Sequence, residues 1–148
     1  MLQRLSLIVG LVALTFAVGT SARTEAQAVE QPRLGAASFT GPYGEGFGTV
    51  RPHTIYNGGD PSGLIDHIRW RRWGDSVAYG TGMHAIFKPH GGYYKRRVRA
   101  FLRVRRLEQC EGHLAYSQLS IKEPRRPGGK PRGWYAWSGA STICEPPY

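Results

Sequence analysis

The chain has 148 residues and a formal net charge of +10, from 20 Lys+Arg against 10 Asp+Glu. Hydrophobic residues make up 41%, with 20 Gly, 10 Pro and 2 Cys, which is ordinary for a globular domain and too apolar for a fully disordered chain. This length fits one domain and excludes a multidomain enzyme, a polytopic membrane protein and a cysteine-rich scaffold. No catalytic signature stands out, so the charge indicates the sign of a partner rather than a reaction.

The first residues have the pattern of a secretory signal peptide. Arg4 precedes Leu5–Val18, an uncharged and mostly apolar run that is shorter than the roughly 20 residues of a membrane-spanning helix. Ala26-Gln27-Ala28 has the small-x-small form of a cleavage site, so we expect residues 1–28 to be removed. Cleavage after Ala22 and retention as an uncleaved anchor are the alternatives. The sequence thus predicts a secreted or cell-wall-associated protein with no membrane span in the mature chain.

The predicted export affects the expected oxidation state of the cysteines and the net charge of the mature chain. An oxidising compartment and an even count predict a disulfide between Cys110 and Cys144, for which only one pairing exists. Loss of Arg4, Arg23 and Glu25 with the leader leaves 18 minus 9, a mature charge of +9.

The mature chain indicates short strands and no amphipathic helix. Residues 29–48 are rich in Gly, Ala, Ser and Pro, and we interpret them as a flexible N-terminal arm before a single β domain at 49–148. Gly80 and Gly82 lie opposite the larger side chains of an alternating run, where they permit a bulge or a close backbone approach. Alternating runs between turn sequences predict strands over 64–73, 77–87, 114–121 and 134–138.

The clearest pattern is the alternation in residues 94–107. Even positions from Val98 to Val104 are apolar, which predicts a strand with one buried face and one basic face. In a helix the arginines would surround the axis. The odd positions carry Lys95, Arg97, Arg99, Phe101, Arg103 and Arg105. About six to seven strands with Gly/Pro turns predict an all-β fold, a small antiparallel sandwich or barrel with one disulfide.

Three short motifs occur in a fixed order: Trp70-Arg71-Arg72-Trp73-Gly74, then Ala78-Tyr79-Gly80-Thr81-Gly82, then Cys110-Glu111-Gly112. Their Trp-x-x-Trp-Gly, Ala-x-Gly-x-Gly and Cys-x-Gly patterns resemble those of a group of small secreted actinobacterial proteins of uncharacterised function. Asp75 stands where that group has a second Gly, and the arginine content here is heavier. The resemblance covers about residues 64–144, implies secretion and an all-β domain, and carries no activity or site residues.

The basic strand suggests a multivalent anionic partner. Seven Lys or Arg occupy the twelve residues Lys95–Arg106 without an acid, and neighbours on one strand face lie about 6.6–7 Å apart. Phosphate, sulfate or carboxylate groups would relieve this repulsion and suit the planar guanidinium. A solvated strand face, or an edge strand kept from aggregation by its charge, has the same pattern.

Aromatic residues near the cations add a second type of contact. Trp134 and Trp137 follow the basic loop at 123–133 and are candidates for stacking on bases or sugar rings, with the core as the alternative. Arg69, Arg71 and Arg72 could extend the basic region from another strand. The predicted ligand-binding residues are Arg97, Arg99, Phe101, Arg103, Arg105, Arg125, Arg126, Lys130, Arg132, Trp134 and Trp137.

Catalytic and metal-binding residue types do not converge in the sequence. The five histidines lack ligand spacing, and the adjacent Asp66 and His67 would point to opposite faces of a strand. Ser62 lacks the Gly-x-Ser-x-Gly context of a nucleophile. An acid/base pair remains open, built from His67 or His84 with Glu45, Glu108 or Glu111.

The sequence therefore favours a secreted, non-catalytic protein that binds an anionic polymer or a cell-envelope surface. We expect a monomer without cofactor or metal, and export argues against genomic DNA as the partner. A small secreted basic hydrolase of RNA or an anionic glycan is one alternative. A structural or partner-binding exported protein is the other.

Overall fold

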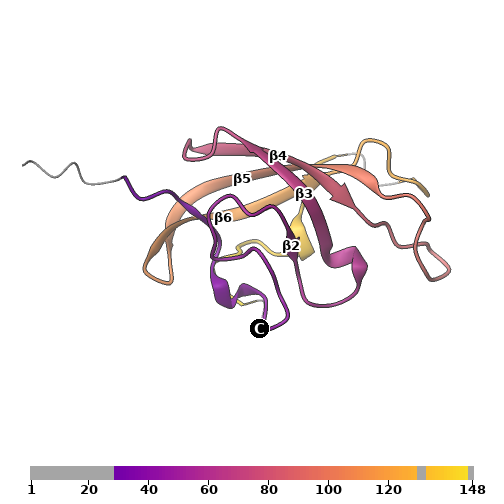
Figure 1. Cartoon of the computed structure of the whole chain (residues 1–148), viewed down its shortest axis with the longest axis horizontal. Helices are drawn as coiled ribbons and strands as arrows, with labels where there is room; N and C mark the ends of the chain where they lie inside the picture. The colour runs from indigo at the N-terminus through magenta and orange to yellow at the C-terminus, as the bar shows by residue number, and fades with distance from the viewer. Residues whose placement is uncertain (1–28, 130–132, 147–148) are drawn as a thin grey trace, which may run out of the picture.

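The structure, a computed structural model, describes residues 29–129 and 133–146, so the predicted leader lies outside the described residues. The described chain forms a seven-stranded sheet with three short 3₁₀ helices, none long and apolar enough to span a membrane. The long strands are β3 (Leu64–Arg71), β4 (Val77–His84), β5 (Val98–Cys110) and β6 (His113–Lys122). The predicted all-β class, strand number and disulfide are confirmed, and the sheet curls into a half-barrel (Figure 1).

The four long strands follow one another as antiparallel neighbours. β2 (Ile55–Tyr56) extends the sheet beside β3, while β1 (Arg33–Leu34) and β7 (Tyr135–Ala136) share the free edge of β6. β1 runs parallel to β6, which departs from the antiparallel expectation. Between β5 and β6, Glu111 and Gly112 both have positive φ, as a two-residue type I′ turn requires.

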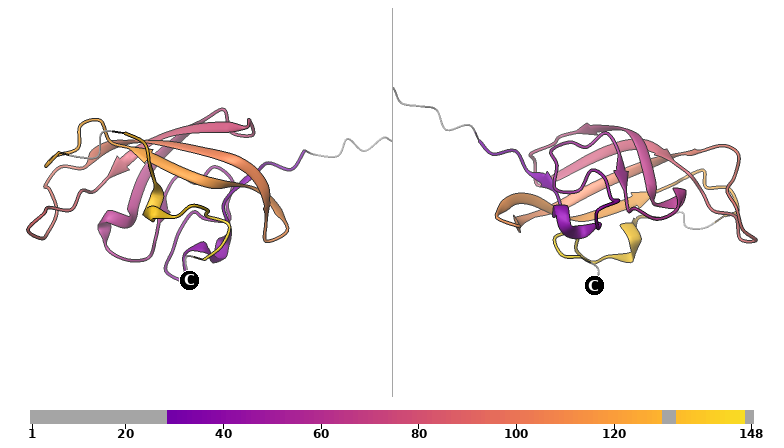
Figure 2. Two further views of the ribbon diagram at one scale, coloured as in Figure 1. Left: turned by 180° about the vertical axis from the view of Figure 1, so that it is seen from behind. Right: turned by 60° about the horizontal axis from the view of Figure 1, so that its bottom comes forward.

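The core lies on the concave side of the sheet only. Figures 1 and 2 show the N-terminal and C-terminal segments crossing beneath that side, which they cover without a second sheet. Leu34, Phe39 and Phe47 from the first segment and Ile143 from the last are at most 5% exposed and join the core. Residues 29–48 are therefore not the loose arm that their composition suggests. The sequence does not reveal Leu34, Phe39 and Phe47 as core residues, because buried positions in irregular structure do not recur at a regular spacing.

Two glycines allow β3 to pack closely on β4. A Cβ on Gly80 would lie 2.9 Å from the Trp70 ring, and one on Gly82 would lie 2.7 Å from Ile65 Cγ2. Both glycines are buried on the core side, so the close backbone approach that the sequence suggests is present. The larger β4 residues consequently point to the opposite side of the sheet.

We expect Gly82→Ala to lower the free energy of unfolding by about 1–3 kcal/mol, because the new methyl would overlap Ile65 and the Asp66 carbonyl oxygen. Gly59→Ala is the matched control, since a Cβ there meets no atom within 4 Å. Urea unfolding of both variants measures the difference. Equal stability of the two would contradict the packing described here.

The disulfide between Cys110 and Cys144 closes a sequence separation of 34 residues. Replacing both cysteines with serine should cost about 3–4 kcal/mol, mainly because the unfolded chain gains freedom. Urea unfolding of the double variant, compared with the oxidised protein, tests this. A loss below about 1 kcal/mol would show that the C-terminal segment stays docked by packing alone.

Candidate functional site

The side of the sheet away from the core forms a surface that we call the outer face. It consists of alternate residues of the long strands and of β7, and none of them is buried. Its members are Asp66, Arg69, Arg71, Val77, Tyr79, Thr81, Met83, Arg99, Phe101, Arg103, Arg105, Gln118, Ser120, Lys122 and Ala136. The covering segments lie on the other side of the sheet (Figure 2), so these side chains meet solvent.

Strand pairing places these side chains in rows across the sheet. One row contains Arg71, Tyr79, Arg103, Ser120 and Ala136 in directly paired order. The adjacent row contains Arg69, Thr81, Phe101 and Lys122. Because directly opposed side chains lie about 4.5–5.5 Å apart, cations and aromatic rings come within reach of one extended ligand.

The charge of the outer face is one-sided. Its members include six cations, from Arg69 to Lys122, and one carboxylate, Asp66. Asp66 accepts a hydrogen bond from Arg97, which also donates to the Met83 carbonyl, so this acid is neutralised at the margin. Burial raises the pKa of the Asp66 carboxyl, but the contacts with Arg97 and His67 outweigh it and hold that pKa below its usual value.

Asp66 and His67 contact each other, contrary to the expectation for strand neighbours. A bulge interrupts the β3–β4 register after Asp66, and His67 has a positive φ of 53°. This brings His67 Nδ1 to 2.8 Å from the Asp66 carboxylate. The irregular φ, which alternation does not reveal, accounts for the difference.

Arg103 stacks on Trp134, and this contact crosses a strand. Its guanidinium carbon lies 4.7 Å from the Trp134 ring centroid, within cation–π range. Arg103 belongs to β5 and Trp134 precedes β7, with β6 between them. Ser120 and Ala136 lie in the same row, and their small side chains leave room for the contact. The stack holds Arg103 in place on the outer face.

The structure brings only part of the predicted ligand-binding set together. Arg99, Phe101, Arg103 and Arg105 lie on the outer face, and Trp134 stacks above it. Arg97 lies at its margin, bound to Asp66, while Arg125 is exposed in the loop after β6.

The others lie away from the outer face. Arg126 is bound to Glu123, and Trp137 is 3% exposed in the core, where its indole N–H donates to Asn57, so neither belongs to this surface. Lys130 and Arg132 lie outside the described residues.

Tyr79 and Lys122 are an aromatic and a cationic residue of the outer face that the sequence does not single out. Both join this face through register, Tyr79 opposite Arg103 and Lys122 opposite Phe101. The alternation of β4 places Tyr79 on one face with Thr81 and Met83, but it does not say which face is solvent-exposed. The small, buried Gly80 and Gly82 are the signal that the larger side chains point outward.

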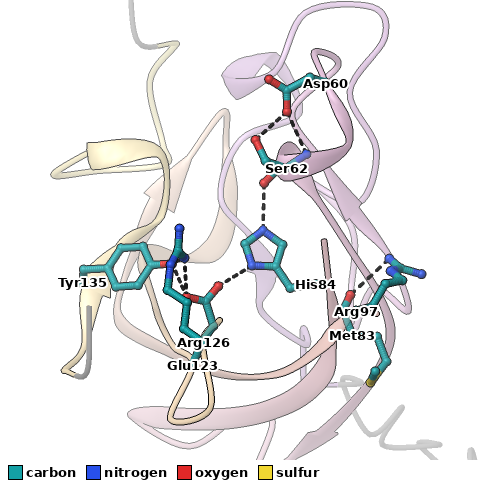
Figure 3. A network of polar contacts seen from close by, with 8 residues as sticks. All are labelled: Asp60, Ser62, Met83, His84, Arg97, Glu123, Arg126 and Tyr135. Carbon is teal, nitrogen blue, oxygen red and sulfur yellow. Dashed lines mark hydrogen bonds and ion pairs between the residues drawn. The ribbon is translucent and has the colours of Figure 1, made fainter. Parts of the chain in front are cut away.

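A polar cluster lies on the concave side of the sheet, at the end where β4 and β6 finish (Figure 3). His84 is 4% exposed and Glu123 1%, and His84 Nδ1 is bound to the Glu123 carboxylate. His84 Nε2 is 2.8 Å from the Ser62 carbonyl oxygen. Both partners are acceptors, so hydrogen bonds to both require a proton on each ring nitrogen. The ring thereby connects the η2 turn (Pro61–Gly63), the end of β4 and the end of β6.

Glu123 is the centre of this cluster. Its second oxygen accepts from Arg126 at 2.7 Å and from the Tyr135 hydroxyl at 2.8 Å. Burial raises the pKa of the Glu123 carboxyl, but hydrogen bonds from His84, Arg126 and Tyr135 outweigh burial and lower the pKa overall. Burial, together with the hydrogen bond to Glu123, raises the pKa of Tyr135. The cluster contains a carboxylate with donors on both oxygens.

A pocket of about 390 Å³ opens beside this cluster. Its walls include Phe87, Ile121 and Trp137 as apolar groups and Asp60 and Arg126 as charged groups. Asp60 already accepts from the backbone N–H and the hydroxyl of Ser62. The polar groups at this pocket are thus largely occupied by one another.

The acid/base pairs considered from sequence do not come together. Among the described residues, no hydrogen bond or ion pair joins His67 or His84 to Glu45, Glu108 or Glu111. Glu111 instead accepts from the backbone N–H groups of Ala37 and Ser38. Within 29–129 and 133–146, no group of three or more His, Cys, Asp or Glu side chains is arranged to hold a metal ion.

Comparison of the chain with protein-family models, with curated proteins and with solved structures finds no significant match. The geometry of the outer face and of the Glu123 cluster is therefore the basis for inferring function.

We expect Glu123→Gln to lower the free energy of unfolding by about 3–5 kcal/mol at neutral pH, because His84 and Arg126 lose their buried counterion. The lowered pKa of Glu123 stabilises the folded state above the usual carboxyl pKa, and this stabilisation is lost as the pH falls through the lowered value. The difference between wild type and variant should therefore shrink below about pH 4.5.

Urea unfolding across the acid range measures this difference. Glu108→Gln is the control, because Glu108 is exposed on β5 and its loss should change stability by no more than about 0.5 kcal/mol. A gap between wild type and Glu123→Gln that widens in acid would contradict the assignment of an ionised Glu123.

Proposed function

We propose that the protein is an exported, non-catalytic binder of an anionic polymer or surface, and that the outer face is its contact surface. The observation that carries the proposal is the set of six cations that β3, β5 and β6 place on one face of the sheet. The opposite side of the same strands forms the hydrophobic core.

The position of β5 argues against a purely protective role for its charge. Edge strands carry charged side chains to prevent pairing with other chains. β5, however, pairs with β4 on one side and with β6 on the other along most of its length. Residues 101–105 are paired on both sides, so Arg103 and Arg105 are not needed to block an edge.

Electrostatics favours a multivalent anion over isolated ions. Cations such as Arg103 and Arg105, two residues apart on one strand, repel by roughly 0.6 kcal/mol in water at 6.6–7 Å. A polyanion that spans several of them relieves this repulsion and releases its own counterions. Guanidinium groups donate in a planar fork that matches phosphate, sulfate and carboxylate oxygens.

The N-terminal sequence pattern indicates the compartment in which we expect the protein to act. A leader followed by a disulfide-bonded domain is typical of exported proteins. The partners available there are wall polysaccharides, polymers like teichoic acid and extracellular nucleic acid. Each carries repeated anionic groups that the outer face can contact in series.

The test removes four outer-face cations together, as Arg69→Gln, Arg99→Gln, Arg103→Gln and Arg105→Gln. Arg97 stays because it neutralises Asp66. We expect the variant to elute from a heparin column at much lower salt than wild type. The slope of log affinity against log salt should also become shallower, because fewer counterions are released when four contacts are lost.

The matched control replaces four exposed cations away from the outer face: Arg51, Arg72, Lys88 and Arg96, each with Gln. It loses the same formal charge, so a nonspecific effect of net charge would lower retention of both variants equally. Equal retention of the two variants overturns the proposal. Tight binding that persists in high salt would instead indicate a partner recognised without charge.

A further inference from the structure

We infer that the ligand of the outer face is single-stranded nucleic acid, whose bases stack on Tyr79, Phe101 and Trp134 while arginines hold its phosphates. The inference rests on the proposed function and names the substrate class of the same site. The outer face presents exposed aromatic side chains, and a protein that binds a polyanion by charge alone does not need them.

Three large aromatic side chains are exposed on or above the outer face. Tyr79 is 43% exposed, Phe101 36% and Trp134 37%. Other aromatic residues pack in pairs, such as Phe39 with Phe47 and Trp70 with Trp73. Among the described residues, no ring–ring contact involves Tyr79, Phe101 or Trp134. Their rings therefore retain apolar surface that a ligand can cover.

The three rings surround Arg103. Tyr79 is its direct partner across the β4–β5 pair, and Phe101 lies two residues before it on the same strand face. Trp134 approaches from the β7 side, with its ring centroid 4.7 Å from the guanidinium carbon. Directly opposed side chains lie about 4.5–5.5 Å apart and same-face neighbours about 6.6–7 Å, so one short segment of polymer can contact all three rings.

The donor and acceptor balance of the face favours nucleic acid over a glycan. Its charged donors are arginines and a lysine, whereas its single carboxylate, Asp66, is bound by Arg97 and His67. Glycan hydroxyl groups carry donor protons that need acceptors, and besides Asp66 the outer face offers only the neutral oxygens of Tyr79, Thr81, Gln118 and Ser120. Phosphodiester oxygens, base carbonyls and ring nitrogens accept hydrogen bonds, and every base has a flat ring for stacking.

The same rings distinguish single strands from duplexes. In a duplex the bases are stacked on one another, so an aromatic side chain on a sheet surface cannot reach their faces. Single strands leave the bases free to stack on side chains while the backbone follows a basic groove or surface. The outer face provides rings and cations alternately, as such binding requires.

The decisive variant removes rings and keeps charge: Tyr79→Leu with Phe101→Leu. The matched control, Tyr43→Leu with Phe87→Leu, removes two exposed aromatics that lie off the outer face, 79% and 49% exposed. The probe is a fluorescein-labelled oligothymidylate of about 12 nucleotides, a length within the range of one binding domain. We expect the outer-face variant to bind it about ten-fold more weakly or worse, and the control to bind it as wild type does.

Heparin, a polyanion without bases, separates this inference from the proposed function. Both variants should retain wild-type affinity for heparin, since no cation changes. If wild type binds heparin but not the oligothymidylate, or if the outer-face variant binds both normally, the nucleic acid inference is wrong while the proposed function stands. If no polyanion binds, both fail.

Tryptophan fluorescence gives an independent readout in the unmodified fold. Trp134 is exposed, whereas Trp73 and Trp137 are buried and Trp70 is partly buried. A base stacked on Trp134 should quench its emission on addition of oligothymidylate but not of heparin, and Trp134→Phe should remove this signal. Equal quenching by both polymers would contradict stacking.

Discussion

The close approach of β3 side chains to the glycines of β4 is the constraint on which the rest of the structure depends. Trp70, Ile68 and Ile65 lie where the Cβ atoms of Gly80 and Gly82 would otherwise be. The sheet can then curl over its concave side, and coil segments from both ends of the chain complete a one-sided core (Figure 1). Because packing is satisfied on that side alone, the outer face is free to carry arginines and exposed rings.

A one-layer sheet needs its ends held, and two different interactions do so. Cys110, the last residue of β5, ties the C-terminal segment to one end of the sheet through Cys144. At the other end, His84 pairs with Val98 at the start of β5 and binds Glu123 and the Ser62 carbonyl. Glu123 in turn holds Tyr135 of β7. The buried histidine thus acts as an anchor of the fold that presents the outer face.

What the sequence predicts is local, and what it misses is long-range. The alternation of β5 reveals which residues share a face because the period of a strand is fixed. The disulfide is predicted from the even cysteine count together with the predicted export. The pairs Arg97–Asp66, Arg103–Trp134 and His84–Glu123 join residues about 30 to 40 positions apart, and only register and chain path bring them together. The packing of residues 29–48 is missed for the same reason, since coil has no period.

On the outer face, stability and the proposed binding make opposite demands on the same residues. Each unpaired cation adds repulsion in the free protein, although the high dielectric of water keeps each pair near 0.6 kcal/mol. Arg97 and Arg103 are the exceptions, because Asp66 and the Trp134 ring offset their charge. Arg103 therefore holds a fixed orientation before any ligand arrives, among the three exposed rings. Loss of conformational freedom on binding is smallest for a side chain that is already ordered. A preformed cation between aromatic rings is a better base for recognition than a larger number of mobile charges.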